Sequence, residues 1–433
     1  MRSSRSGKLS LGLSAVAIVL LTLFLTATRA AAQTETILHN FGDNGTDGVD
    51  PRGGLILDAA GNLYGTTMAL GPANEGIVFE LMPMAGGTWK EIELHAFGHG
   101  KDGQIPVASL VFDAAGNLYG TTALGGAYNA GTVFELSPQS NGSWKETILH
   151  SFNPARKDGV QPGCPLVFDP SGNLYGTTGG GGAYGTTYTG GIVFELSPQP
   201  NGNWTETILH NFNPNTTDGS DPGEGGVVLD ASGNLYGTTV EGGAYACNSY
   251  VNCGTVFELT PKLGGGWAER ILHNFQDNGA DGYWPGTGVI FDQAGNLTGT
   301  TSMGGAHGEY YGGGVVFELT PAAGGSWAET IVYSFDPSNG IDGYSPNSVT
   351  MGANGNLYGT TVQGGSGLYG MVYELTPKTG GGWTEDILHS FAENGTDGYE
   401  PESGVVVDAN DNVYGTTYLG GTHEGGIVFE ITP

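Results

Sequence analysis

The segment Gly-Asn-Leu-Tyr-Gly-Thr-Thr recurs along this chain and constrains its fold more than any other feature. Its first copy is Gly61–Thr67, and six more follow at steps of 55, 56, 61, 62, 60 and 56 residues. Of the later copies, the fourth and the sixth differ slightly from the first; all six are Gly116–Thr122, Gly172–Thr178, Gly233–Thr239, Gly295–Thr301, Gly355–Thr361 and Asp411–Thr417. A period this regular indicates an array of similar structural units.

Each unit contains four short segments with the composition of β-strands. In the first unit these are Gly54–Asp58, Asn62–Thr67, Ile77–Leu81 and Trp89–Phe97. They are rich in β-branched and aromatic residues, and Gly, Pro, Asn and Asp separate them. No long helical pattern of apolar residues occurs after the N-terminal region. Four strands in each of seven units predict an all-β fold, a seven-bladed β-propeller of four-stranded blades.

The two ends of the repeated region predict how the array closes. Thr34–Phe41 matches the fourth segment of a unit but has no first three before it, and Ile427–Ile431 matches a third segment with no fourth after it. An open array would leave both edges unpaired, whereas a ring pairs them. We therefore expect residues 34–41 to form the outer strand of the last blade, which begins at about residue 402.

The connections between the segments fall into two groups. Short turns within each unit lie on one face of the expected ring, and longer connections such as Gly42–Gly53 and Ala123–Gly131 lie on the other. Sequence variation concentrates in the long connections. We therefore expect ligands to bind on the face that these connections form, here called the long-loop face.

Residues 1–32 differ in kind from the rest of the chain. A basic start is followed by the apolar run Leu11–Thr26 and then by Ala30-Ala31-Ala32. This order is typical of a secretory signal peptide cleaved after the alanines, and an uncleaved membrane anchor is the alternative. The expected organisation is a signal peptide at 1–32 and one propeller domain at 33–433, in a protein exported to the periplasm or the extracellular space.

The charge of the chain limits its partners. Without residues 1–32, it has 9 basic and 43 acidic residues, a net charge of −34. Such a surface repels nucleic acid and anionic lipid and favours solubility. We expect no nucleic-acid partner, no membrane span after signal cleavage, and a monomer.

Three cysteines occur in the chain. Cys247 and Cys253 lie six residues apart in one long connection, and after export we expect them to form a disulfide. Cys164 has no neighbour in sequence and is expected to be a small buried residue. Neither spacing matches a zinc site.

Acidic residues and histidines repeat with the units. The third segment carries Glu80 or its equivalent, and the fourth carries Glu91 and His95 or theirs, with Tyr333 as the one replacement for histidine. Because these segments are neighbouring strands, we expect a contact between Glu80 and His95. An active site is not needed seven times, so we interpret the contact as structural, and a tyrosine can donate the same hydrogen bond.

The motif Asp-Gly-x-x-Pro follows the fourth segment in every unit. In one hypothesis the Asp caps a turn and the Gly adopts a positive φ. In the other, the loops that carry Asp43 with Asp47, and Asp277 with Asp281, bind calcium through their oxygen atoms. Neither loop has the spacing of an EF-hand, so we favour the turn. No other cofactor is predicted.

Function is expected where the units differ. After Asp-Gly, three units carry aromatic residues, and the connections between the second and third segments add more tyrosines and two histidines. The candidates for ligand binding are Tyr283, Trp284, Tyr344, Tyr399, Tyr310, Tyr369, His307 and His423. Aromatic residues can stack on sugars or anchor a protein partner, and they can equally pack the loops.

Three repeated segments in this order, Gly-Asn-Leu-Tyr-Gly-Thr-Thr, Gly-x-Val-Phe-Glu-Leu-x-Pro and Leu-His-x-Phe, resemble the tandem-repeat family known as GloVer repeats. The resemblance covers about Thr34 to Pro433. It implies an exported bacterial protein, and it implies no established activity, so no catalytic residue is transferred. Many members carry C-terminal surface anchors, whereas here the repeat reaches the last residue, which favours a secreted or periplasmic protein.

Two functions from different classes remain. The first is a non-enzymatic binding or scaffolding module whose ligand, a glycan or a protein, docks on the long-loop face. The alternative is a propeller enzyme of the lactonase or glycan lyase type, which needs unique His, Asp or Glu residues that converge on the central channel. The chain has no GxSxG, HExxH, P-loop or dinucleotide-binding motif, so we favour binding.

Overall fold

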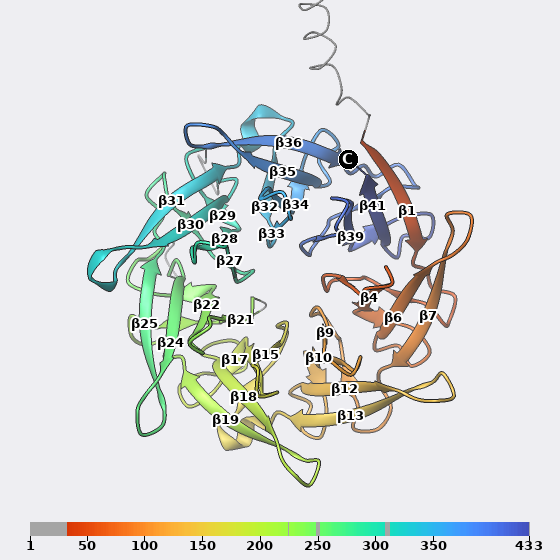
Figure 1. Cartoon of the computed structure of the whole chain (residues 1–433), viewed down its shortest axis with the longest axis horizontal. Coiled ribbons are helices and arrows are strands. Elements are labelled where there is room, and N and C mark those ends of the chain that lie inside the picture. The colour runs from red at the N-terminus through yellow and green to blue at the C-terminus, as the bar shows by residue number, and fades with distance from the viewer. Residues whose placement is uncertain (1–32, 224, 248–251, 308–311, 433) are drawn as a thin grey trace, which may run out of the picture.

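A computed structural model describes residues 33–223, 225–247, 252–307 and 312–432. Seven antiparallel sheets stand around a central axis, with short inner strands towards the axis and long outer strands at the rim (Figure 1). The sheet of the sixth blade has a fifth strand. The predicted seven-bladed β-propeller is therefore confirmed.

Each blade is named by its strands from the innermost to the outermost. Blade 1 has β3 (Ile56–Leu57), β4 (Leu63–Thr67), β6 (Ile77–Pro83) and β7 (Trp89–Ala96), and blade 2 has β9 (Val111–Phe112), β10 (Leu118–Thr122), β12 (Thr132–Pro138) and β13 (Trp144–Ser151). Blade 3 has β15 (Val167–Phe168), β16 (Leu174–Thr178), β18 (Ile192–Pro198) and β19 (Trp204–Asn211). Blade 4 has β21 (Val227–Leu229), β22 (Leu235–Thr239), β24 (Thr255–Pro261) and β25 (Trp267–Asn274). Blade 5 has β27 (Val289–Phe291), β28 (Leu297–Thr301), β30 (Val315–Pro321) and β31 (Trp327–Ser334); blade 6 has β33 (Thr350–Met351), β34 (Leu357–Gly364), β35 (Met371–Pro377) and β36 (Trp383–Ser390), with β32 (Gly343–Pro346) also paired to β34; blade 7 has β38 (Val406–Val407), β39 (Val413–Thr417), β41 (Ile427–Thr432) and β1 (Thr34–Asn40).

The N-terminal strand closes the ring. β1 pairs antiparallel with β41, and Ile37 lies opposite Phe429 in the register. Figure 1 shows β1 at the rim beside β41, so the two ends of the repeated region share one blade. The closure predicted from the incomplete terminal units is confirmed, and it removes the free edge that β41 would otherwise expose.

Phenylalanines from neighbouring blades form the core. Phe79 in β6 is fully buried, and its ring centroid lies 5.1 Å from that of Phe41, which follows β1. The same contact joins Phe97 of blade 1 to Phe134 of blade 2. In the repeated segment, a Cβ added to Gly65 would lie 2.6 Å from the Phe79 ring. The glycine is therefore needed for close packing beneath the aromatic ring.

Small two-stranded sheets accompany the blades, and the sequence did not predict them. They pair β2 (Gly48–Val49) with β5 (Ala69–Leu70), β8 (Gly103–Gln104) with β11 (Leu124–Gly125), β14 (Gly159–Val160) with β17 (Gly180–Gly181), β20 (Gly219–Ser220) with β23 (Glu241–Gly242), β26 (Gly282–Tyr283) with β29 (Met303–Gly304), and β37 (Gly398–Tyr399) with β40 (Leu419–Gly420). The described residues also form three single-turn 3-10 helices, η1 (Pro154–Arg156), η2 (Ala323–Gly325) and η3 (Pro337–Asn339). No helix in this part of the chain has the length and hydrophobicity that a membrane crossing requires.

The Asp-Gly-x-x-Pro loops differ from the expected turn. Gly48 does not have a positive φ; a Cβ there would lie 1.8 Å from the Thr67 hydroxyl oxygen, so this position needs glycine for space. The left-handed residue is Asp50, just before the proline, with φ of 59°. Its N–H donates to the carbonyl of Gly425, and its own carbonyl accepts from Met68, at 3.0 Å each. These two hydrogen bonds hold Asp50 in that conformation.

Cys247 and Cys253 form a disulfide, with their Cα atoms 5.1 Å apart. Cys164 is fully buried, and its sulfur donates to the carbonyl of Thr177 at 3.1 Å. The disulfide between Cys247 and Cys253 lies within the long connection between β22 and β24 of blade 4.

Candidate functional site

The repeated histidines lie at the junctions between blades. His150 at the end of β13 has its Nε2 atom 3.0 Å from Asp158 Oδ2 and 3.7 Å from a carboxylate oxygen of Glu206 in blade 3. The aspartate belongs to the Asp-Gly motif, and the glutamate belongs to the outer strand of the next blade. Equivalent groups, here called inter-blade sets, are His39–Asp47–Glu91, His95–Asp102–Glu146, His210–Asp218–Glu269, His273–Asp281–Glu329, His389–Asp397–Glu35 and, with tyrosine, Tyr333–Asp342–Glu385.

The prediction that Glu80 contacts His95 was wrong. A β-bulge between Val78 and Phe79 shifts the register, so that Glu80 lies opposite Ile92 rather than His95. The carboxylate of Glu80 instead accepts a hydrogen bond of 2.8 Å from the hydroxyl of Tyr64 on the neighbouring strand. The structural interpretation of both residues stands, but each has a different partner.

Burial and charge shift the titration of the inter-blade sets. Burial, a hydrogen bond with the adjacent Asp102 and the charge of Asp102 together raise the pKa of Glu146 to about 9. Burial acts in the same direction on Asp102, but hydrogen bonds from His95 and Glu146 outweigh it and hold the pKa of Asp102 below its ordinary value. Glu146 therefore keeps its proton at neutral pH and donates it to ionised Asp102.

The inter-blade sets also have the composition of cation ligands. In at least five of them, one donor atom from each of the three residues lies within 4.8 Å of the others. Asp158 Oδ2, however, accepts a hydrogen bond of 2.9 Å from the backbone N–H of Asn153 as well as the contact from His150. These contacts already satisfy that oxygen, as a structural role for the set requires.

The loops considered for calcium use their oxygen atoms within the turn. Asn44 Oδ1 accepts hydrogen bonds from the N–H groups of Thr46 and Asp47, at 3.0 and 2.8 Å. Asn278 Oδ1 does the same for Asp281 at 2.9 Å. The two remaining candidates, Asp43 and Asp277, are exposed.

The predicted aromatic candidates do not form one cluster. Tyr283 is only 6% exposed, and Trp284 packs beside it against the core of blades 4 and 5. Tyr369 and Tyr399 lie together, with ring centroids 5.5 Å apart. Tyr344 is half-buried in β32. Tyr310 lies outside the described residues. The large aromatic side chains that are most exposed in the described part of the chain lie in the long connections of blades 2 to 4: Tyr128, Tyr184, Tyr188 and Tyr245.

The two candidate histidines have separate surroundings. His307 in blade 5 has its Nδ1 atom 3.8 Å from Asp336. His423 in blade 7 packs against Gly42, and its Nδ1 atom lies 3.2 Å from the hydroxyl of Thr422. These contacts give no common site for the two histidines.

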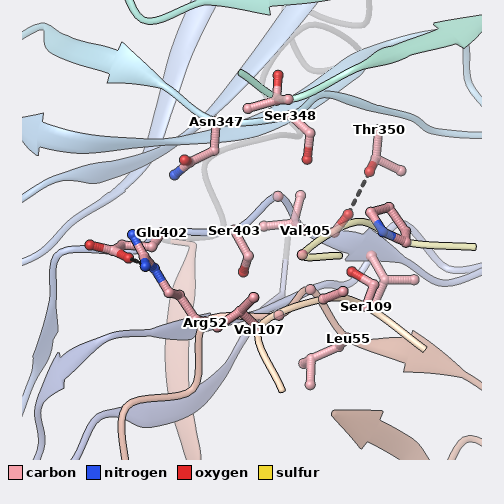
Figure 2. Close-up of a pocket in the computed structure, with 18 of the residues that line it drawn as sticks. Arg52, Leu55, Val107, Ser109, Asn347, Ser348, Thr350, Glu402, Ser403 and Val405 are labelled. Atoms are coloured by element: carbon pink, nitrogen blue, oxygen red, sulfur yellow. Dashed lines mark hydrogen bonds and ion pairs between the residues drawn. The ribbon is translucent and has the colours of Figure 1, made fainter. Parts of the chain in front are cut away.

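A pocket of about 300 Å³ lies at the mouth of the central channel (Figure 2). Its walls are the chain segments that follow the proline in six of the Asp-Gly-x-x-Pro loops and lead into the innermost strands. The pocket therefore lies where the channel meets the long-loop face. Six blades contribute the residue directly after that proline, which are Arg52, Val107, Gly163, Gly286, Asn347 and Glu402.

The pocket lining breaks the symmetry of the ring. Arg52 of blade 1 donates from Nε to a carboxylate oxygen of Glu402 in blade 7, as Figure 2 shows, although the two residues are 350 positions apart. Burial raises the pKa of nearby Asp50, and the charge of Glu402 raises it further. Burial also raises the pKa of Tyr418, with contributions from the charges of Asp50 and Glu402. The junction of blades 7 and 1 is therefore the charged side of the pocket.

Sequence reasoning missed three residues of the pocket lining, Arg52, Glu402 and Asn347. One signal in the sequence could have indicated these residues. The proline of the Asp-Gly-x-x-Pro motif recurs in every unit, whereas the residue directly after it changes from blade to blade. Only the ring closure brings blades 7 and 1 together, so the pairing of Arg52 with Glu402 was not readable from local patterns.

Several solved structures are similar to this chain in arrangement. One is the periplasmic gluconolactonase of Pseudomonas aeruginosa, with a TM-score of 0.49 and 13% identity over 82% of this chain and 86% of that one. A luciferin-regenerating enzyme has a TM-score of 0.43 and 12% identity over 93% and 95% of the two chains. An oxidoreductase described as a glucose dehydrogenase, from Thermus thermophilus, has a TM-score of 0.41 and 15% identity over 92% and 99%. No curated protein matches the chain.

Family comparison gives a direct assignment. The profile of the Gloeobacter/Verrucomicrobia repeat matches residues 23–248 and 248–433, which together span almost the whole chain. The repeated segments that resemble GloVer repeats lie within these matches. The chain therefore belongs to the Gloeobacter/Verrucomicrobia repeat family.

Proposed function

We propose that this protein is an exported, non-enzymatic binding module that holds a glycan or a protein ligand on its long-loop face. The supporting observation is the pocket at the channel mouth. Its equivalent positions carry Arg52, Val107, Asn347 and Glu402 within a framework that otherwise repeats from blade to blade. A scaffold alone does not need this variation, whereas a binding site placed on a rigid ring does.

The pocket is better suited to binding than to acid–base catalysis. Among the described residues that line it, Glu402 is the one acidic and Arg52 the one basic side chain, and they are paired with each other. The repeated histidines are engaged at the blade junctions, away from this lining. A lactonase or lyase mechanism would need additional unique groups converging on the channel.

A glycan array tests the proposal. The wild type is compared with the double variant Arg52→Val/Glu402→Val, which gives blades 1 and 7 the residue type of Val107 in blade 2. We expect the wild type to bind and the double variant to lose binding, while Met84→Ala, a control at an exposed residue in the turn between β6 and β7 and outside the pocket lining, keeps it. Equal binding by the wild type and the double variant would exclude the channel mouth as the site.

Export is part of the same proposal and has its own test. Expression in a bacterial host with residues 1–32 present, followed by N-terminal sequencing of the periplasmic and medium fractions, should yield a chain that begins at Gln33. Recovery of the uncleaved chain from membranes would support the anchor instead.

A further inference from the structure

We propose that the long-loop face over blades 1 to 3 carries a second binding site, which takes an acidic polysaccharide, one that contains uronic acids. Its residues, here called the basic-aromatic arc, are Lys101, Tyr128, Arg156, Lys157 and Tyr184. The inference rests on the proposed function in one respect, that ligands bind the long-loop face. None of the five residues lines the pocket at the channel mouth.

The cations of the arc interrupt an acidic pattern. The loops that follow the outer strands of blades 7, 4 and 6 each carry an exposed acidic residue, which are Asp43, Asp277 and Glu393. The equivalent loops after blades 1 and 2 carry exposed Lys101, and exposed Arg156 with Lys157. The chain has nine basic residues after position 32, and three of them therefore lie in two neighbouring loops. Positive charge is concentrated on one sector of a protein that otherwise repels anions.

No internal ion pair accounts for these three cations. Within the part of the chain that the structure describes, none of their side chains forms a salt bridge or a hydrogen bond. The acidic residues of the same two loops, Asp102 and Asp158, are buried, and their carboxylates face His95 and His150. The cations therefore face solvent and are available to a ligand.

Lys157 has a backbone conformation that disfavours lysine. Its φ is 62°, in the left-handed region. In five of the other loops at this place in the repeat the left-handed residue is a glycine, and these are Gly45, Gly100, Gly279, Gly340 and Gly395. Glycine adopts this conformation without the steric cost that a Cβ brings. A strained residue whose side chain makes no compensating contact in the described chain is typical of a functional position.

The loop 152–158, with its two adjacent cations, lies against the connection that carries Tyr128. At its start, the N–H of Phe152 donates to the carbonyl of Gly131 in that connection at 3.1 Å. The hydroxyl of Ser151, one residue earlier, accepts from the N–H of the residue directly before Tyr128 at 3.3 Å. The tyrosine is therefore held beside the basic loop.

The remaining members of the arc are placed in the same way. At the end of the basic loop, the carbonyl of Asp158 accepts a hydrogen bond of 2.9 Å from the N–H of Gly182, two residues before Tyr184. The carbonyl of Asp102, next to the third cation, accepts one of 2.7 Å from Gly126 in the connection with Tyr128. Blades 1 to 3 follow one another in the ring (Figure 1), so cations and tyrosines alternate along this arc.

The exposed rings favour a polysaccharide over an acidic peptide. Tyr128 and Tyr184 are 52% and 57% exposed. The other large hydrophobic side chains that are exposed in the described chain and are not tyrosines lie outside the arc, and these are Met84, Leu263, Ile341 and Leu368. A peptide needs apolar anchor points, whereas the flat faces of sugars stack on tyrosine rings. Carboxylates of uronic acids pair with lysine and arginine, so an acidic polysaccharide uses both kinds of residue.

Calorimetric titration with hexasaccharides of hyaluronan, alginate and polygalacturonate, and with neutral chitohexaose, tests the inference. We expect at least one acidic hexasaccharide to bind more tightly than chitohexaose and to bind more weakly at high salt. The triple variant Lys101→Ala/Arg156→Ala/Lys157→Gly should bind it about tenfold more weakly or less, because three exposed ion pairs are lost. Tyr128→Ala should also weaken it. Lys378→Ala, which removes an exposed cation from the short turn between β35 and β36, is the matched control and should keep full binding.

Lys157→Gly separates binding from folding. Glycine suits the left-handed conformation, so the melting temperature of this variant should stay close to that of the wild type while binding weakens. Unchanged binding in this variant, together with equal binding by the triple variant and Lys378→Ala, would overturn the inference. Absence of binding by all three acidic hexasaccharides would do the same. Polyglutamate or oligothymidylate that binds as tightly, with no loss in Tyr128→Ala, would show that the surface recognises charge alone and would remove the polysaccharide assignment.

The channel-mouth variant Arg52→Val/Glu402→Val distinguishes the two proposals. It leaves the arc intact and should keep the acidic hexasaccharide. If no acidic hexasaccharide binds, but this variant loses glycans on the array, the inference fails and the proposed function stands. If the hexasaccharide binds and the array shows no loss in this variant, the arc is the binding site and the channel mouth is not.

Discussion

Tyr333 Oη lies 3.1 Å from Asp342 Oδ2, in the position where the other six blades set a histidine against the aspartate of the Asp-Gly motif. The same oxygen lies 2.8 Å from Glu385 Oε2 on the outer strand of the next blade. One phenol therefore joins two carboxyl groups across a blade junction. The substitution that interrupts the histidine pattern in the sequence preserves the hydrogen bond to the aspartate.

Removing this hydroxyl should destabilise the junction of blades 5 and 6. In Tyr333→Phe, two partly buried carboxyl groups lose their shared partner, and we expect a loss of about 1–3 kcal/mol in the free energy of unfolding. Tyr333→His should restore most of it, because the other blades use histidine at this position. Denaturant unfolding measures the change, with exposed Tyr188→Phe as the control. Equal stability of the Phe and His variants would contradict the structural role.

Stability should fall as the pH rises from mildly acidic to alkaline values. The pKa of Glu146 in the folded protein is about 9, raised from 4.5 by burial and by Asp102. For a raised pKa, the stabilisation is fully present below the unfolded value and is lost as the pH rises through the folded one. Glu206 behaves in the same way, so the melting temperature should decline between about pH 5 and pH 9.

A neutral amide at one junction tests the origin of this decline. Glu146→Gln keeps a donor towards Asp102 and cannot ionise, so its melting temperature should fall less steeply with pH than that of the wild type. Asp43→Asn, which removes an exposed carboxylate, should leave the slope as it is. The same slope in all three proteins would show that the inter-blade glutamates are not responsible.

The junction that closes the ring should contribute as much to the free energy of unfolding as any other blade junction. Phe41 after β1 and Phe97 of blade 1 are both fully buried and make equivalent contacts. We expect Phe41→Ala and Phe97→Ala to cost about the same, roughly 3–5 kcal/mol each. Deletion of residues 34–41 should lower the melting temperature further, because it also exposes the edge of β41. An unchanged melting temperature after the deletion would contradict closure by β1.

Glycine in the repeated segment should tolerate no added side chain. In Gly65→Ala, the methyl group would lie 2.6 Å from the Phe79 ring and 2.9 Å from Leu55, and the resulting strain should cost about 1–3 kcal/mol. Gly286→Ala is the matched control, since its nearest neighbour, a methyl of Val240, is 4.0 Å away. Differential scanning calorimetry of the two variants provides the comparison, and equal melting temperatures would refute the packing argument.

Calcium should change stability little. The carboxylate of Asp47 contacts His39 and the N–H of Gly42, and Asn44 caps the same loop. We expect the melting temperature in millimolar calcium to match that in a chelator. A large increase with calcium would show that these loops bind the ion and that the turn interpretation is incomplete.

The sequence alone determined the architecture of this protein. Period and strand alternation are local properties, and the incomplete units at Thr34–Phe41 and Ile427–Ile431 were enough to predict ring closure. The prediction of Glu80 beside His95 failed because a bulge of one residue changes which side chains face each other, and nothing in the repeated pattern marks that bulge.

Only the tertiary structure decided the candidate site. Arg52 and Glu402 are distant in sequence, and they meet because the last blade closes against the first. The sequence left open whether Tyr283 and Trp284 bind a ligand or pack the loops, and the fold packs them against the core of blades 4 and 5. Burial and contacts between distant segments arise when the ring is assembled. A repeated sequence therefore specifies the framework in advance, and the identity of the groups that gather at its axis depends on the fold.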